Sequence, residues 1–363
     1  MKTFGYKLLA IILSLGFVLS SCVKEDDPTN NDQSILPSQF SIDVPNSISS
    51  QLANKSTQSD TLNGNEIYGH LRNFIAIGEG AATIVESIIG VISVYQINHA
   101  MNLTYTSDED QREKNLVVLE EQSYEGQQFE FSMTISDAQS TTNADEGKGL
   151  QIFWNRQPIE GVAILKPYNI NRDENLNQMN AIFKIEYSEV ATSNYEKHMV
   201  VSIANLNNLN ADPYYMKNLK MFVGKNSDII DVYGNSDHPN ANFFTNETGF
   251  DWAFVASSVE SSDIGVAEVG LPSNDLNTYS RSAILVDNAL QTVFSTQIGT
   301  LGYAQEDIDR FLYNTEAPGF FNRYGFVQGG TAPSSDYDAI TSRISLLTPY
   351  NPYEIANLSV VFE

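Results

Sequence analysis

The longest regular pattern of hydrophobic positions spans residues 67–97 and has the spacing of a helix. Apolar residues such as Ile67 and Leu71 recur there three or four positions apart, which is the periodicity of one helix face. Most of the remaining circumference is also apolar, and only a narrow stripe that includes Glu79 and Glu86 stays polar. Such a helix must be enclosed by other structure. The two glutamates argue against a membrane span, because a charged side chain at the bilayer centre costs about 2.5–3.5 kcal/mol.

Downstream of this helix, apolar and polar residues alternate, which predicts strands with one buried face. The clearest examples are 129–135 and 181–188. Similar segments lie at 116–121, 150–154, 161–166, 199–204, 219–223, 229–233, 251–256 and 264–269, separated by clusters of Asn, Asp, Gly and Pro. Strands joined by turns without intervening helices indicate an antiparallel meander. We also predict a short helix at 305–313 and closing strands at 340–347 and 355–362.

Together the patterns predict an α+β fold dominated by strands, in which an antiparallel meander or partly closed barrel packs around the helix at 67–97. One-sided strands and an apolar helix can bury each other. No repeat or linker-like segment follows Phe40, so we expect one β-rich domain over 40–363, with 239–249 as an alternative boundary. A transmembrane barrel is the alternative fold, although the segments lack the regular ten-residue length of its strands.

The first 21 residues form an export signal rather than part of the fold. Lys2 and Lys7 flank the start of an apolar stretch that is too short to span a bilayer comfortably. The stretch ends in Leu19-Ser20-Ser21-Cys22, which resembles the lipobox of bacterial lipoproteins. The resemblance implies that a signal peptidase cuts before Cys22 and that Cys22 becomes lipidated, with palmitate among its acyl chains. The membrane would then be contacted through this N-terminal lipid only.

An acidic segment follows the cysteine. Val23-Lys24-Glu25-Asp26-Asp27 is similar to the signal that sends Bacteroidota lipoproteins to the outer face of the outer membrane. This similarity implies a cell-surface location, and a solvated tether is the alternative interpretation. Residues 22–39 are polar overall, so we expect a lipidated cysteine followed by a flexible tether. The resemblance implies nothing about the domain that follows.

The charge of the chain excludes one large class of partners. With 20 Lys and Arg against 45 Asp and Glu, the net charge is −25 at pH 7. Nucleic acid is therefore not expected to bind, because its recognition depends on Lys and Arg that neutralise phosphates. The hydrophobic content of 42% is sufficient for a sizeable core. Cys22 is the only cysteine, so stability must come from packing rather than from disulfides within the chain.

No local motif predicts catalysis. A Gly-x-Ser-x-Gly elbow is missing from the sequence, and its only cysteine belongs to the anchor. The four histidines are far apart and form no His-Glu-x-x-His pair for zinc. Glu79 and Glu86 lie two helical turns apart, roughly 10.5 Å, and we interpret them as a polar stripe that reaches solvent or bonds residues of the sheet. We assign no catalytic residue and no metal ligand.

Calcium is the one cofactor that we consider. The candidates are the acidic loops Asp108-Glu109-Asp110 and Asp145-Glu146 and the alternating oxygen donors at Asn171, Asp173, Asn175 and Asn177. The last set fails as an EF-hand, because Ile182 stands where a bidentate Glu would close the loop. We interpret these segments as solvated turns, with calcium binding as the alternative.

Two aromatic segments are candidates for ligand binding. Phe320, Phe321 and Tyr324 lie between glycines, and Tyr350 and Tyr353 lie in a proline-stiffened loop. Exposed rings could stack on a glycan or anchor an envelope protein, whereas buried rings would be core residues. We therefore expect a surface-anchored lipoprotein with a non-enzymatic binding or structural role in the cell envelope. The alternative is a lipid-anchored hydrolase that acts on glycans or peptides.

Overall fold

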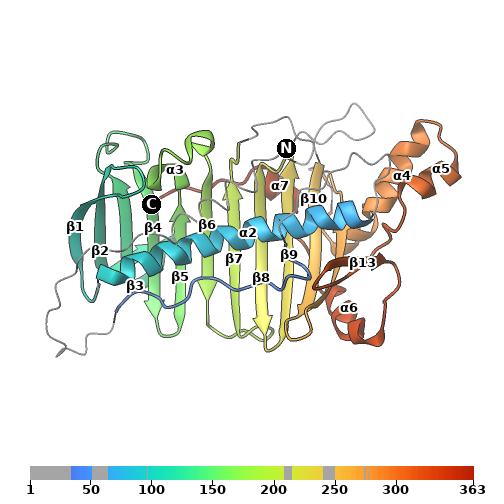
Figure 1. Cartoon of the computed structure of the whole chain (residues 1–363), viewed down its shortest axis with the longest axis horizontal. Helices are drawn as coiled ribbons and strands as arrows, with labels where there is room; N and C mark the ends of the chain where they lie inside the picture. The colour runs from blue at the N-terminus through green and yellow to red at the C-terminus, as the bar shows by residue number, and fades with distance from the viewer. Residues whose placement is uncertain are drawn as a thin grey trace. The chain divides into compact units, whose positions relative to one another are not determined.

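The computed structural model describes residues 34–50, 64–95, 97–207, 215–239, 250–273, 275–276 and 278–363. Thirteen strands in these residues form one antiparallel sheet, whose order in space is the order in the chain and which is not closed (Figure 1). One long apolar helix and several short helices accompany the sheet. The predicted β-dominated meander with one apolar helix is thus confirmed. Cys22 lies outside the described residues, as does the alternative boundary at 239–249 apart from Pro239.

The elements have the following bounds. The strands are β1 (Met101–Thr106), β2 (Glu113–Tyr124), β3 (Gln127–Asp137), β4 (Lys148–Arg156), β5 (Ile159–Leu165), β6 (Ile182–Ser188), β7 (Lys197–Ala204), β8 (Asn218–Asn226), β9 (Ile229–His238), β10 (Phe250–Val259), β11 (Ile264–Gly270), β12 (Gly319–Asn322) and β13 (Gly325–Gly329). The helices are α2 (Gly64–Ile92), α3 (Pro167–Ile170), α4 (Leu290–Thr300), α5 (Gln305–Phe311), α6 (Asp338–Ile344) and α7 (Pro352–Ala356).

The ten strand-like segments of the sequence match β2–β11 to within one residue at each end that they overrun, and the predicted short helix at 305–313 contains α5 and extends two residues beyond it. The two predicted closing strands are wrong. The first is α6, whose buried Ile340 and Ile344 have helical spacing. The second begins as α7, with Pro352 at its first position and the Asn351 side chain accepting a hydrogen bond from the Tyr353 amide. The sequence patterns did not reveal β1, β12 or β13.

The chain divides into two compact units. The first comprises Met1–Ser41, Gly80–Val190 and Val361–Glu363 and contains β1–β6. Within it, the fully buried Trp154 donates its indole N–H to the Ile35 carbonyl at 2.8 Å. The second comprises Ile42–Glu79 and Ala191–Val360 and contains β7–β13. Within it, the Phe74 ring of α2 meets Trp252 of β10 edge-on, with centroids 5.6 Å apart.

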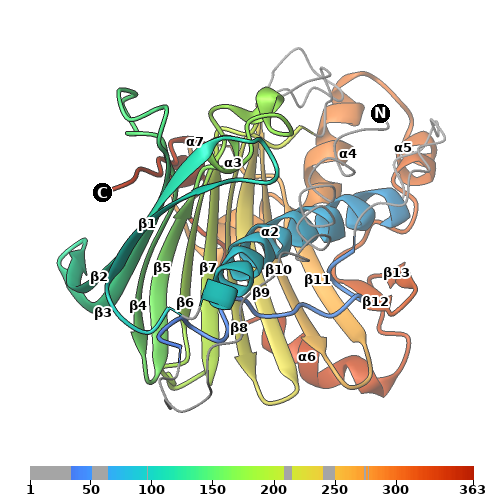
Figure 2. The same ribbon diagram turned by 60° about the vertical axis from the view of Figure 1, so that its left-hand side comes forward.

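Within the second unit, the first part of helix α2 lies against β8 and β10 (Figure 2). By length and composition, residues 67–92 could cross a membrane, but the core helix of a soluble protein passes the same test. Here Ile75, Ala81 and Val85 are fully buried, as predicted for an enclosed helix. The helix also approaches the sheet closely, because a Cβ added to Gly78 would lie 2.6 Å from Met221 Cε.

The polar stripe of α2 holds the segment that precedes the helix. In the second unit, Glu79 accepts hydrogen bonds from the Val44 amide at 2.9 Å and from the Ser49 hydroxyl. In the first unit, Glu86 accepts hydrogen bonds from the Phe40 amide at 3.2 Å and from the Ser41 hydroxyl. The N-terminal segment (residues 34–50) is therefore tied to the helix by side chains rather than by strand pairing.

Candidate functional site

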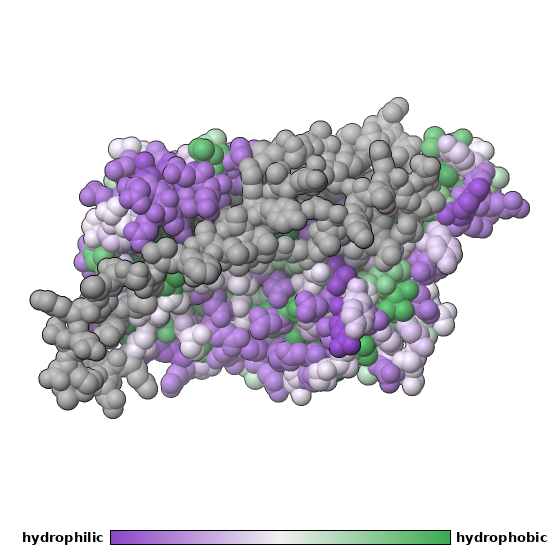
Figure 3. All heavy atoms as spheres, viewed as in Figure 1, coloured by the Kyte–Doolittle hydropathy of each residue, from purple (hydrophilic) through white to green (hydrophobic). Residues whose placement is uncertain are grey.

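Three connections of the first unit meet at one end of its strands, because every second turn of an antiparallel meander lies on the same side. They join β1 to β2, β3 to β4 and β5 to β6, and the last of them carries α3. Hydrophilic residues gather over this part of the surface (Figure 3). The charged groups that the connections bring together form a buried network beside a pocket.

Asp137, the last residue of β3, is the centre of the network. Its carboxylate accepts two hydrogen bonds from Arg112, at 2.8 and 3.1 Å, and one from Arg172 Nε at 2.7 Å. The Ser140 hydroxyl and the Gln139 amide donate two more, at 3.1 and 3.0 Å. Burial by itself would raise the pKa of Asp137, but these donors outweigh it and hold the pKa at about 2. The side chain is fully buried and remains ionised at neutral pH.

A second buried ion pair braces the same connections. Lys114 Nζ donates to Asp110 Oδ2 at 2.8 Å, and both side chains are almost completely buried. Burial would raise the pKa of Asp110, but the hydrogen bonds from Lys114 and from the Arg172 amide lower it overall. Lys114 also donates to the Asn169 carbonyl in α3 at 3.1 Å. The pair thereby joins the start of β2 to α3.

Asn169 links this network to the pocket. Its side-chain oxygen accepts a hydrogen bond from Arg172 at 3.3 Å, and its side-chain NH₂ donates to Asp145 Oδ2 at 2.9 Å and to the Lys148 carbonyl at 2.8 Å. Asp145 Oδ2 also accepts from Lys166 Nζ at 2.5 Å. Although burial would raise the pKa of Asp145, these donors lower it overall. The position of each polar group is therefore fixed by a partner on another connection.

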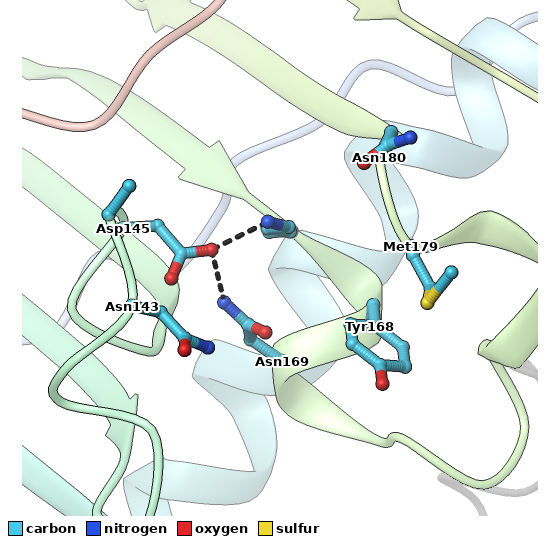
Figure 4. Close-up of a pocket in the computed structure, with 8 residues that line it drawn as sticks. Asn143, Asp145, Tyr168, Asn169, Met179 and Asn180 are labelled. Carbon is cyan, nitrogen blue, oxygen red and sulfur yellow. Dashed lines mark hydrogen bonds and ion pairs between the residues drawn. The ribbon is translucent and has the colours of Figure 1, made fainter.

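The pocket has a volume of about 330 Å³ and is open to solvent. Asp145 and Asn169 form its polar floor, and Asn143, Tyr168, Met179 and Asn180 lie around them (Figure 4). The Arg172 guanidinium lies 4.6 Å from the centroid of the Tyr168 ring, which helps to hold the ring in place. The arrangement can bind a small polar ligand through groups that are positioned before the ligand arrives.

The candidate calcium loop at residues 171–177 lies next to this pocket. The Asn171 side-chain oxygen accepts hydrogen bonds from the amides of Asp173 and Glu174, at 3.1 and 3.2 Å. Asn175 donates to the Asn171 carbonyl at 2.9 Å. Among the residues that the structure describes, no three His, Cys, Asp or Glu side chains are grouped as metal ligands would be. Calcium binding stays a prediction.

The aromatic candidates occupy different environments. Phe320 and Phe321 of β12 are buried, at 1% and 0% exposure, and belong to the core of the second unit. Tyr324 is 82% exposed and Tyr353 is 58% exposed. Tyr350 is half-buried, with its ring 5.5 Å from that of Tyr233. Tyr324 and Tyr353 are thus the two rings of the predicted set that a surface ligand can reach.

The second unit contains buried carboxyl groups of its own. Asp237 and Asp251 are cross-strand neighbours on β9 and β10. Burial raises the pKa of Asp251 to about 9, and the nearby Asp237 adds to this effect. Burial also raises the pKa of Asp237, against the charge of Lys217. Because both side chains are enclosed, we interpret them as core groups that favour the protonated form rather than as a ligand site.

Comparisons with family models, with curated proteins and with solved structures found no match to this chain. The site therefore has to be judged on its own chemistry. The sequence drew attention to Asp145 only as part of an acidic loop, and it missed Lys166, Asn169 and Tyr168. These residues could have been found from the topology. Alternate turns of an antiparallel meander lie at the same end of the sheet, so polar residues in those turns must lie near one another.

Proposed function

We propose that this protein is a lipoprotein of the outer membrane, anchored through Cys22 at the cell surface, whose role is to bind a ligand of the cell envelope without transforming it. The lipobox-like Leu19-Ser20-Ser21-Cys22 supports the anchor. The pre-formed pocket beside α3 supports the binding role and is the observation that carries the proposal.

The pocket suits binding because two of its polar groups, Asp145 and Asn169, are held in place before a ligand arrives. Asp145 and Asn169 are fixed by the hydrogen bonds of the buried network. A site that is ordered in advance loses less conformational freedom on binding. Ligand binding therefore does not have to order Asp145 and Asn169, because the folded protein already does so.

The same contacts favour binding over acid–base chemistry. A general base works best with a pKa near the operating pH. The donors around Asp145 shift its pKa downward, away from neutrality. The carboxylate is thereby suited to accepting hydrogen bonds rather than to moving protons.

The anchor is tested by labelling cells with radioactive palmitate. Label should enter the wild-type protein and not Cys22→Ala, and protease added to intact cells should remove the domain. Label in the Cys22→Ala protein would refute the anchor, and protection from protease would refute the outward orientation.

The binding role is tested on the full mature chain in detergent, with cell-envelope extracts as the probe. A ligand that prefers the folded state raises the melting temperature. The extract should stabilise the wild type and not Asn143→Ala/Asn180→Ala, which removes two exposed amides of the pocket. If the extract stabilises Asn143→Ala/Asn180→Ala but not Tyr324→Ala/Tyr353→Ala, the ligand binds the exposed rings and not the pocket. Turnover of a glycan or peptide in the extract would favour the hydrolase.

A further inference from the structure

The charges in the pocket limit the class of ligand, and this inference rests on the binding function proposed above. Lys166 Nζ lies 2.5 Å from Asp145 Oδ2, so the two charged groups of the pocket neutralise each other. The attraction of an anion to the Lys166 ammonium is offset by repulsion from the Asp145 carboxylate, and the reverse holds for a cation. Like charges placed together oppose binding. The pocket therefore favours an uncharged ligand.

Groups that can hydrogen-bond a ligand surround this neutral pair. The Lys166 ammonium has three donor hydrogens, and one of them bonds Asp145. Asn143 and Asn180 are exposed and lie on opposite sides of the Asp145–Asn169 pair (Figure 4). Each amide offers an oxygen acceptor and two donor hydrogens. Hydroxyl groups match such a mixture, because each can both donate and accept.

The rest of the wall supplies carbon surface. Tyr168 and Met179 line the pocket, and Met179 is 51% exposed. A sugar ring carries hydroxyls around its edge and C–H groups on its faces, so it can bond the amides while a face rests on the Tyr168 ring. The volume of about 330 Å³ is near the lower end of the range for small-molecule sites, about 300–1,000 Å³. It suits a compact ligand rather than a long acyl chain.

We propose that this pocket binds an uncharged hexose, either free or as a terminal unit of a glycan. Asn143 and Asn180 bond its hydroxyls, the Lys166–Asp145 ion pair presents a surface without net charge, and Tyr168 contacts one face of the ring.

Isothermal titration of the full mature chain in detergent tests this assignment. The probes are glucose, galactose, mannose and N-acetylglucosamine, with glucuronate and inorganic phosphate as charged counterparts. At least one neutral sugar should bind saturably, and glucuronate should bind about tenfold more weakly than glucose because its carboxylate meets Asp145. Asn143→Ala/Asn180→Ala should weaken the neutral sugar about tenfold or more, since two hydrogen-bonding groups are lost. Asn102→Ala, an exposed asparagine of β1 outside the pocket, should bind like the wild type.

The inference fails if no neutral sugar binds, if glucuronate matches glucose, or if the double variant keeps its affinity. If envelope extract still stabilises the wild type and not the double variant while every sugar fails, the proposed binding function stands and the hexose assignment falls. Comparing a free sugar with its methyl glycoside separates a monosaccharide ligand from a glycan end. If the ligand is the terminal unit of a glycan, the methyl glycoside should bind as well as the free sugar. Should the double variant unfold, Asn180→Ala alone provides the same comparison.

Discussion

Replacing Asp137 by asparagine tests whether the buried network stabilises the first unit. The pKa of Asp137 is about 2, against 3.8 for an unperturbed aspartate. Since one pKa unit corresponds to about 1.4 kcal/mol, the interactions of the ionised form contribute about 2.5 kcal/mol at neutral pH. The variant also leaves Arg112 and Arg172 without their carboxylate, and breaking a buried ion pair costs about 3–5 kcal/mol. We therefore expect Asp137→Asn to lower the free energy of unfolding by between about 2.5 and 5 kcal/mol at pH 7.

The pH dependence makes this prediction specific to ionisation. Because the folded-state pKa is depressed, the contribution of Asp137 is complete above about pH 4 and is lost as the pH falls to about 2. The difference in the free energy of unfolding between the wild type and Asp137→Asn should become smaller as the pH falls over that interval. Urea unfolding followed by tryptophan fluorescence at pH 7, 4 and 2.5 measures it, since Trp154 lies in the same unit.

Asp173→Asn is the matched control, because Asp173 is an exposed carboxylate next to Arg172 in sequence. It should change stability by no more than about 0.5 kcal/mol. The reasoning would be refuted by an Asp137→Asn protein as stable as the control, or by a difference from wild type that stays constant between pH 7 and pH 2.5.

Three further predictions concern the helix and the second unit. Gly90→Ala should stabilise α2 by up to about 1 kcal/mol, because its methyl group meets no atom within 4 Å. Gly78→Ala should be less stable than Gly90→Ala, because its Cβ would lie 2.6 Å from Met221 Cε and would displace that side chain, and equal melting temperatures would contradict this. Burial raises the pKa of Asp251 to about 9, so wild-type stability should fall by about 1.4 kcal/mol per pH unit between about pH 4 and 9. Asp251→Asn should remove that slope in chemical unfolding, and a slope that persists would exclude this group as its cause. Glu86→Ala should cost about 1–3 kcal/mol and speed hydrogen exchange in the N-terminal segment, whereas unchanged exchange would show that its hydrogen bonds are dispensable.

The periodic parts of the fold could be predicted from the sequence, because each strand of a meander pairs with its sequence neighbour. The errors arose where one segment fits two periods. Ile340, Ile344 and Leu347 suit one face of a helix, but the intervening polar residues also resemble the alternation of a strand. Only tertiary packing resolves such short segments.

The candidate site was harder to predict because it is assembled across connections. Asp145 lies after β3, while its partners Lys166 and Asn169 lie after β5. Their meeting depends on the register of β3, β4 and β5, which alternation alone does not specify. The partners of Glu79 and Glu86 could not be predicted either. They lie in the N-terminal segment, which has no strand pairing that would fix its position along the helix.

The order of strands in the sheet has a consequence for how the chain folds. Each strand pairs with the strand that precedes or follows it in the chain, so the contact order of the sheet itself is low and pairing can proceed while the chain is being made. Helix α2 is the exception, because it is made early while its partner Trp252 follows late. The apolar surface of the helix therefore stays uncovered until β10 has been made, and during that interval it is exposed to non-native association.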